Sequence, residues 1–275
     1  MLKTTSYNPI IRLDLAHTLA GRGWYWTTAY LVDGLLVDSG CAHSAPELLT
    51  YLCNKKLTYL VNTHTHEDHI GANGPLQRTK EGLKILTHPL ALPVLIEPRE
   101  RQPLHPYRRV MWGWPEPSNG EQVLDGELVR MPNFSFQVIY TPGHSPDHIC
   151  LYEPERGWLF SGDLFVGGRD RALSADADIW GVIRSLKKIA DLPLKVLFPG
   201  SARVRENPRD ELQEKIAYLE AMGERVLDLN AKGWSVDAIA RTMFGGPMLI
   251  EIVTFGHFSR RNLVLSYLRV ADIFS

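Results

Sequence analysis

Six side chains that could bind a metal ion fall in three short segments of this 275-residue sequence. Residues 64–69 read His-Thr-His-Glu-Asp-His, and the other two donors stand alone, further along the chain. Imidazole and carboxylate groups are suitable ligands for zinc, iron or manganese. A lone histidine usually satisfies a hydrogen bond in a core or lies on a surface, but a stretch so rich in donors indicates a metal site. The predicted ligands are His64, His66, Asp68, His69, His144 and Asp163.

Each of these segments directly follows a stretch with the pattern of a buried strand. The apolar run 57–62 ends just before the histidine cluster, residues 134–140 precede Thr141-Pro142-Gly143-His144, and residues 158–161 precede Gly162-Asp163. Strand ends can converge on one edge of a sheet. The sequence therefore predicts that the three segments bring their donors together there.

Strand and helix patterns alternate through most of the chain. Residues 29–32 and 35–37 flank Asp33-Gly34, which favours a two-residue type I′ hairpin. Ser44 is expected to cap a helix that ends near Lys55, with Glu47 completing a capping box. Residues 97–120 hold five prolines and no periodicity, which predicts a long loop. Further strands are expected at 84–87, 149–152 and 195–198, and further helices at 89–96 and 179–190.

After Pro208 the pattern becomes helical. Residues 209–232 carry one apolar stripe at helical spacing, and two more helices are expected from Ser235 to Phe244 and from Ser259 to Ile273. We therefore predict a catalytic domain over residues 1–208 and a helical C-terminal region over residues 209–275.

Composition limits the choice of partners and compartment. The formal net charge is −1, which argues against nucleic acid or an anionic membrane as the main partner. No apolar stretch reaches the roughly 20 residues that span a bilayer, and we see no secretory signal. Three cysteines without a C-x-x-C pair fit a reducing compartment. We expect a cytoplasmic protein that acts on a small-molecule substrate, and a homodimer is left open.

The motifs together resemble those of the metallo-β-lactamase-fold superfamily. The stretch His-Thr-His-Glu-Asp-His-Ile-Gly resembles its H-x-H-x-D-H signature, Thr141-Pro142-Gly143-His144-Ser145 its second motif, and Phe160-Ser161-Gly162-Asp163 its third. The strand end Asp38-Ser39-Gly40 resembles its D-[ST]-G element. The resemblance covers about residues 25–205 and implies an α/β fold, a four-layer α/β/β/α sandwich, here followed by a C-terminal helical appendage.

The resemblance also implies how the donors divide between two metals. His64, His66 and His144 would bind a first metal, and Asp163 would bridge to a second one bound by Asp68 and His69. The family usually adds a histidine after a Pro-Gly pair, but here Pro199-Gly200 is followed by Ser201. A neutral hydroxyl is a poor zinc ligand, so the second site should be weak, filled by water or empty. We expect one or two Zn²⁺ per chain, with iron or manganese as alternatives.

Such a site activates water. A bound divalent ion can lower the pKa of its water to about 7, and the hydroxide attacks an electrophilic carbonyl or phosphorus. Asp68 could orient the hydroxide or accept its proton, and His148 could donate to an oxyanion or support the site. Arg169, Arg171 and Ser201 are candidates for contacts with substrate, and the two arginines could equally serve as solvated surface groups.

These residues predict a metal-dependent hydrolase of an ester, thioester, lactone or similar acyl bond in a small molecule. Alternatives are an RNA phosphodiesterase, a mono-iron oxidoreductase resembling a persulfide dioxygenase, and a metal-binding module without catalysis. Tyr107, Trp112 and Trp114 could wall the substrate pocket, or they could pack the 97–120 segment onto the domain.

Overall fold

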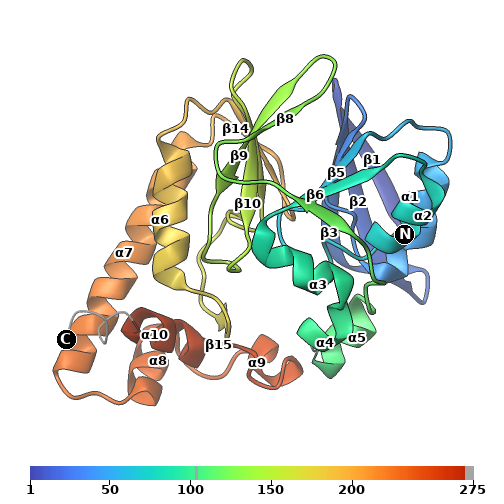
Figure 1. The fold of residues 1–275 in the computed structure, drawn as a ribbon. Coiled ribbons are helices and arrows are strands. Elements are labelled where there is room, and N and C mark those ends of the chain that lie inside the picture. The colour runs from blue at the N-terminus through green and yellow to red at the C-terminus, as the bar shows by residue number, and fades with distance from the viewer. Residues whose placement is uncertain (103–104, 270–275) are drawn as a thin grey trace. The chain divides into compact units, whose positions relative to one another are not determined.

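The computed structural model describes residues 1–102 and 105–269, and its contacts divide the chain into two compact units (Figure 1). The first unit comprises residues 1–140, 147–166 and 193–207. The second comprises residues 141–146, 167–192 and the chain from Pro208.

The first unit contains two β-sheets. In the seven-stranded sheet, which follows chain order, strands β1 to β4 pair antiparallel and β4 to β7 pair parallel. Its strands are β1 (Leu2–Tyr7), β2 (Ile10–Leu19), β3 (Arg22–Val32), β4 (Leu35–Val37), β5 (Tyr59–Val61), β6 (Lys84–Thr87) and β7 (Gly120–Gln122).

The predicted hairpin joins β3 to β4. Asp33 and Gly34 both have positive φ, at 53° and 84°, as a type I′ turn requires. This turn sets the register Val32 opposite Leu35, and the apolar residues 29–32 and 35–37 that flank it are buried. The hairpin prediction is confirmed.

The six-stranded sheet runs in the order β14-β13-β11-β10-β9-β8, and only the β11–β13 pair is parallel. Its strands are β8 (Leu128–Arg130), β9 (Ser135–Tyr140), β10 (Ile149–Glu153), β11 (Trp158–Gly162), β13 (Val196–Pro199) and β14 (Arg205–Glu206). The expected strands that precede His144 and Asp163 are therefore present.

The two sheets share one apolar core. Tyr30 and Ile10 of the first sheet belong to the same buried cluster as Phe136, Phe160 and Phe198 of the second. Burying each such side chain contributes about 1.5–3 kcal/mol. The Tyr30 hydroxyl donates to the Pro199 carbonyl oxygen over 2.7 Å, which satisfies its polar end inside the core.

A second cluster joins the seven-stranded sheet to helices on its outer face. Leu48 and Leu52 of α1, Leu76 of α2 and Leu95 of α3 pack with strand residues, and Figure 1 draws α1 and α2 beside β1 and β2. The helices of this unit are η1 (Ala42–Ser44), α1 (Ala45–Leu52), α2 (Asn73–Thr79), η2 (Pro89–Ala91), α3 (Leu92–Ile96), α4 (Pro98–Arg101) and α5 (Pro106–Met111).

Two local predictions were wrong. Ser44 precedes α1, but its side chain makes no capping hydrogen bond and its hydroxyl instead donates to the carbonyl oxygen of Cys41, the residue before η1. Glu47 binds the amino group of Met1 and does not complete a capping box. The 97–120 segment is not a continuous loop, since it forms α4 and α5, each with a proline in its first turn, and begins β7. Proline is favourable in the first turn of a helix, so the number of prolines in this segment did not by itself indicate a loop.

The second unit is mainly helical. The predicted helices α6 (Ile179–Ala190), α7 (Arg209–Ala231) and α8 (Val236–Phe244) are present, and Ser235 caps α8 by accepting from the Ala238 amide. The third expected C-terminal helix is α10 (Arg260–Leu268), and the predicted end at Ile273 lies outside the described residues. This unit also contains α9 (Leu249–Val253) and a small sheet of β12 (Leu173–Ser174) and β15 (Phe258–Ser259).

Tyr267 of α10 ties these helices together. It is fully buried, its hydroxyl donates to the Leu219 carbonyl oxygen of α7 over 2.7 Å, and its ring meets Trp180 of α6 edge-on.

The predicted α/β fold class, with two sheets, helices and a helical C-terminal region, is confirmed. Among the described residues, no helix combines the length and apolar character needed to cross a bilayer.

Candidate metal centre

The histidine motif forms a buried loop directly after β5. His64 and His69 are fully buried and His66 is nearly so. Their rings are close, since the His64 centroid lies 4.1 Å from that of His69 and 4.6 Å from that of His66. A loop that buries three imidazoles needs polar partners for their nitrogens.

His69 is held by one nitrogen and presents the other to two carboxylates. Its Nδ1 donates to Oδ2 of Asp38 over 2.8 Å. Its Nε2 lies 3.5 Å from Oδ2 of Asp163 and 3.9 Å from Oδ2 of Asp68. This Nε2 is buried and has no hydrogen-bond partner among the described residues.

The charge around His69 favours a cation between these groups. Burial lowers the pKa of His69, but the carboxylates of Asp38, Asp163 and Asp68 outweigh it and raise the pKa well above the ordinary value. Burial also raises the pKa of Asp68, against the influence of His69. A divalent ion could replace the His69 proton and neutralise both carboxylates at once.

Asp38 also orients His64, through Thr63. The Thr63 hydroxyl donates to Oδ2 of Asp38 over 2.8 Å and lies 3.0 Å from Nδ1 of His64, which can donate to it. The Thr63 amide donates to the other Asp38 oxygen over 2.8 Å. With Nδ1 protonated in this arrangement, the Nε2 lone pairs of His64 and His69 can point toward a metal. Groups that bind the second nitrogen of a metal-binding histidine usually set the tautomer and orientation of its ring in this way.

We expect Asp38→Asn to weaken metal binding by about 10–100-fold. The carboxylate accepts from the Thr63 hydroxyl and His69 with one oxygen and from the Thr63 amide with the other, whereas an amide has a single accepting oxygen and cannot satisfy all three donors. Metal titration followed by calorimetry checks this. Asp33→Asn is the matched control, because Asp33 lies in the half-buried β3–β4 turn and binds Asn133. If the two variants bind the metal with equal affinity, Asp38 does not support the metal site.

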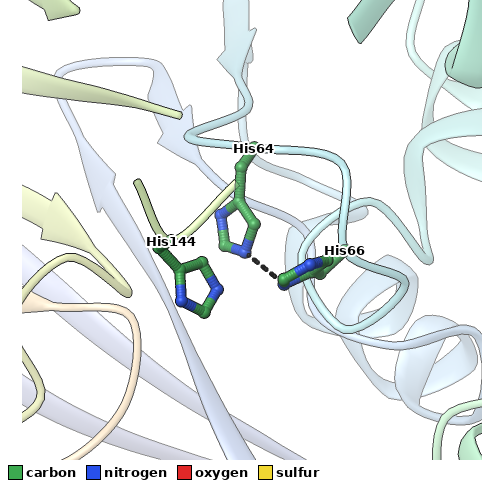
Figure 2. A group of neighbouring side chains, drawn as sticks. All are labelled: His64, His66 and His144. Carbon is green, nitrogen blue, oxygen red and sulfur yellow. Dashed lines mark hydrogen bonds between the residues drawn. The ribbon is translucent and has the colours of Figure 1, made fainter. Parts of the chain in front are cut away.

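Two overlapping groups of donors have ligand atoms within 4.8 Å of one another. One is His64, His69 and Asp163. The other is His64, His66 and His144, and Figure 2 shows these three rings turned toward one another, with Nε2 of His64 3.0 Å from Nδ1 of His66. The residues present thus fit a divalent ion, both by donor type and by the buried, unbonded Nε2 of His69.

Glu67, inside the motif, turns away from these donors. It is fully buried and accepts a hydrogen bond from Nε of Arg108 on α5, whose side chain is only 9% exposed. Burial raises the pKa of Glu67 to about 7, although Arg108 opposes the shift. The Arg108 guanidinium lies 5.7 Å from the centroid of the Trp112 ring.

His148 and Ser201 take different positions around the donors. His148 is fully buried, with its ring 5.2 Å from that of His64. Ser201 follows Gly200, where a Cβ would lie 2.6 Å from Oδ1 of Asp163 and 2.8 Å from the His69 ring. The turn that carries Ser201 therefore passes directly beside two predicted ligands of the second metal.

The two predicted substrate arginines make contacts within the second unit. Arg169 lies over the Tyr218 ring at 5.4 Å, and Arg171 donates to the Phe244 carbonyl oxygen over 2.6 Å. Asp170 between them pairs with Lys215 over 2.7 Å. Their role in substrate binding stays a prediction.

Sequence reasoning gave no role to Asp38 or to Arg108. The Asp-Ser-Gly motif predicted that Asp38 lies at a strand end, but it did not reveal the hydrogen bonds of Asp38 to Thr63 and His69. Arg108 carried no signal, because its partner Glu67 is 41 residues away in the sequence.

Comparison with known proteins identifies the class to which this fold and these donors belong. The profile of the metallo-beta-lactamase superfamily matches residues 22–201, a span that includes all six predicted ligands. The chain belongs to this superfamily.

Two curated relatives and one solved structure illustrate the similarity. An atrochrysone carboxyl ACP thioesterase of Aspergillus fumigatus is 26% identical over 199 residues, covering 71% of this chain and 55% of the relative. A hydroxyacylglutathione hydrolase of Legionella pneumophila is 30% identical over 175 residues, covering 62% of this chain and 58% of the relative. The alignments thus span little more than half the length of either relative.

The structural similarity extends over nearly the whole chain. A metallo-beta-lactamase family protein of Thermus thermophilus matches with a TM-score of 0.70 and 21% identity, covering 97% of this chain and 94% of the other. At this identity the match supports the fold alone.

Proposed function

We propose that this chain is a metal-dependent hydrolase that cleaves the acyl bond of a small-molecule thioester. The observation that carries the proposal is the buried Nε2 of His69, which has no hydrogen-bond partner among the described residues and faces the carboxylates of Asp163 and Asp68. Superfamily membership supports it, as do one relative named as an ACP thioesterase and another named as a hydroxyacylglutathione hydrolase.

In the proposed reaction, water adds to the acyl carbonyl, the carbon–sulfur bond breaks, and the thiolate leaves and takes up a proton. A bound divalent ion would supply Lewis acidity and lower the pKa of water toward about 7. Asp68, partly accessible beside His69, would orient the water and accept its proton. Buried His148 would orient the acyl oxygen or stabilise the histidine cluster.

The metal count follows from the residue after Gly200. We expect about one tightly bound ion per chain, because Ser201 replaces the extra imidazole that would strengthen a second site. Ser201→His should raise the count measured by mass spectrometry of the metals toward two. Two tightly held ions in the unchanged protein would contradict the argument. The same measurement decides among zinc, iron and manganese.

The substrate class is tested with a panel of one acyl group presented as thioester, oxygen ester and lactone, together with bis-p-nitrophenyl phosphate. We expect the thioester to have the highest kcat/KM and all turnover to disappear on chelation and return with added metal. If the phosphodiester is the best substrate, the chain is a phosphodiesterase and the proposal is wrong.

A further inference from the structure

A cavity of about 620 Å³ lies in the first unit, beside α5 and apart from the predicted metal ligands. Its walls come from η1, from Arg99 and from residues between 106 and 114, and include His43, Arg109 and Trp114. This volume falls in the range of about 300–1,000 Å³ that is typical of small-molecule sites.

The cavity carries uncompensated positive charge. The guanidinium groups of Arg99 and Arg109 lie 5.7 Å and 5.6 Å from the centroid of the Trp114 ring. Neither forms an ion pair with any described residue, and no acidic residue lines the cavity. The neighbouring Arg101, by contrast, pairs with Glu97 over 3.1 Å. The chain as a whole has a net charge of −1, so this positive charge is local.

The walls hold the two arginines in defined positions. Trp114 offers its ring to both guanidinium groups, an arrangement that stabilises a cation and restricts its motion. His43 closes one side, where its ring stacks on His17 at 3.8 Å and its Nε2 lies 3.4 Å from the Arg109 carbonyl oxygen. An incoming anion would therefore meet donors that are already placed.

Helix α5 connects this cavity to the motif loop. Arg108 and Arg109 are consecutive, yet Arg108 binds Glu67 between His66 and Asp68, whereas Arg109 lines the cavity. A ligand held at the cavity is thus bound by the helix that also contacts the motif loop.

We propose that this cavity binds a phosphate group on the thiol part of the thioester substrate. Two guanidinium groups match the charge of a phosphate and can donate to it in forked geometry, and arginine is preferred over lysine for such recognition. The inference rests on the proposed thioesterase function for its substrate class. The phosphate could belong to a phosphopantetheine arm or to the nucleotide of coenzyme A, and the experiment separates these sources.

The first test measures binding without turnover. Calorimetric titration of the metal-loaded full chain compares phosphopantetheine and coenzyme A with pantetheine, which lacks the phosphate. We expect at least one phosphorylated compound to bind about ten- to a hundredfold more tightly than pantetheine. The Arg99→Gln/Arg109→Gln variant should lose this preference, and Arg101→Gln should keep it.

Each outcome of the titration is decisive. A preference for phosphopantetheine places the arm's phosphate in the cavity, and a preference for coenzyme A alone places a nucleotide phosphate there. Equal binding of all three compounds overturns the inference, as does an equal loss in the Arg101→Gln control. Arg99 and Arg109 are exposed, so the double variant should fold, which circular dichroism verifies.

A second measurement separates this inference from the proposed function. With acyl thioesters of the same thiols, the double variant should raise KM for the phosphorylated substrate about tenfold or more and leave kcat and the pantetheine thioester unchanged. If phosphate-dependent binding is found but no thioester is hydrolysed, the thioesterase proposal fails and the anion site stands. If thioesters are hydrolysed without any effect of phosphate, the thioesterase proposal stands and the proposed phosphate site fails.

Discussion

His66→Ala should lower kcat/KM by at least about a thousandfold, since losing an inner ligand should cost more than the 10–100-fold typical of outer partners. The ring of His66 is nearly buried, and its Nδ1 lies 3.0 Å from Nε2 of His64. Removing it leaves two imidazoles of the group in Figure 2 and a gap that water would fill. Steady-state kinetics on the best thioester, with the metal content of each preparation, checks this.

His88→Ala is the matched control for this prediction. His88 lies just after β6 in the same sheet, stacks on Tyr140 at 4.3 Å and accepts from the Leu90 amide, and it belongs to neither donor group. We expect its activity and metal content to stay near those of the unchanged protein. Full activity of His66→Ala would overturn the catalytic assignment.

Arg108→Ala should destabilise the protein by about 3 kcal/mol, because it leaves the carboxylate of Glu67 buried without its partner. The estimate lies at the lower end of the range for broken buried pairs, because burial raises the pKa of Glu67 and losing Arg108, which lowers it, should raise it further, so that Glu67 can take up a proton. Denaturant unfolding at pH 8 measures the loss.

Two comparisons separate this effect from the simple loss of a charge. Arg101→Ala breaks an exposed pair with Glu97 and should cost less than about 1 kcal/mol. Adding Glu67→Gln to Arg108→Ala removes the buried charge and should restore part of the stability. If Arg108→Ala costs no more than Arg101→Ala, the buried pair is not what holds α5 on the motif loop.

The Arg108–Glu67 pair joins α5 to the motif loop. Trp112 lies over Arg108 and meets both Tyr25 and Tyr107 edge-on, so the aromatic residues of this segment pack around the buried guanidinium. The contacts of Trp112 and Tyr107 show packing, whereas a role of these aromatic residues in walling the substrate pocket stays a prediction. Part of the cluster packs the segment, while Trp114 lines the cavity beside it.

Local patterns were enough to predict the strands that lead into each motif. The apolar run before His64 and the Asp33-Gly34 turn appear as expected, and the strand predicted over residues 134–140 is β9 (Ser135–Tyr140). In each case neighbours in the sequence impose the structure: side chains alternate along a strand, and Asp-Gly accepts positive φ. The stripe of α7 from Leu212 to Leu229 is likewise buried, because helical periodicity is local.

Local patterns failed where a distant residue competed for a group. The sequence pattern predicts that Glu47 completes a capping box, but its carboxylate accepts from the Met1 amino group instead. Proline content suggested a loop at 97–120, yet Arg108 anchors a helix there through a partner far away in the sequence.

The sequence by itself determined which side chains can bind a metal and which strands precede them, since donor type and strand pattern are properties of short segments. Only the tertiary structure decided that one carboxylate, Asp38, orients both His64 and His69, and that Arg99 and Arg109 both lie over Trp114 without an ion pair to any residue that the structure describes. These features depend on distances between segments far apart in the chain. Those distances follow from how the sheets and helices pack, which no short stretch of sequence encodes.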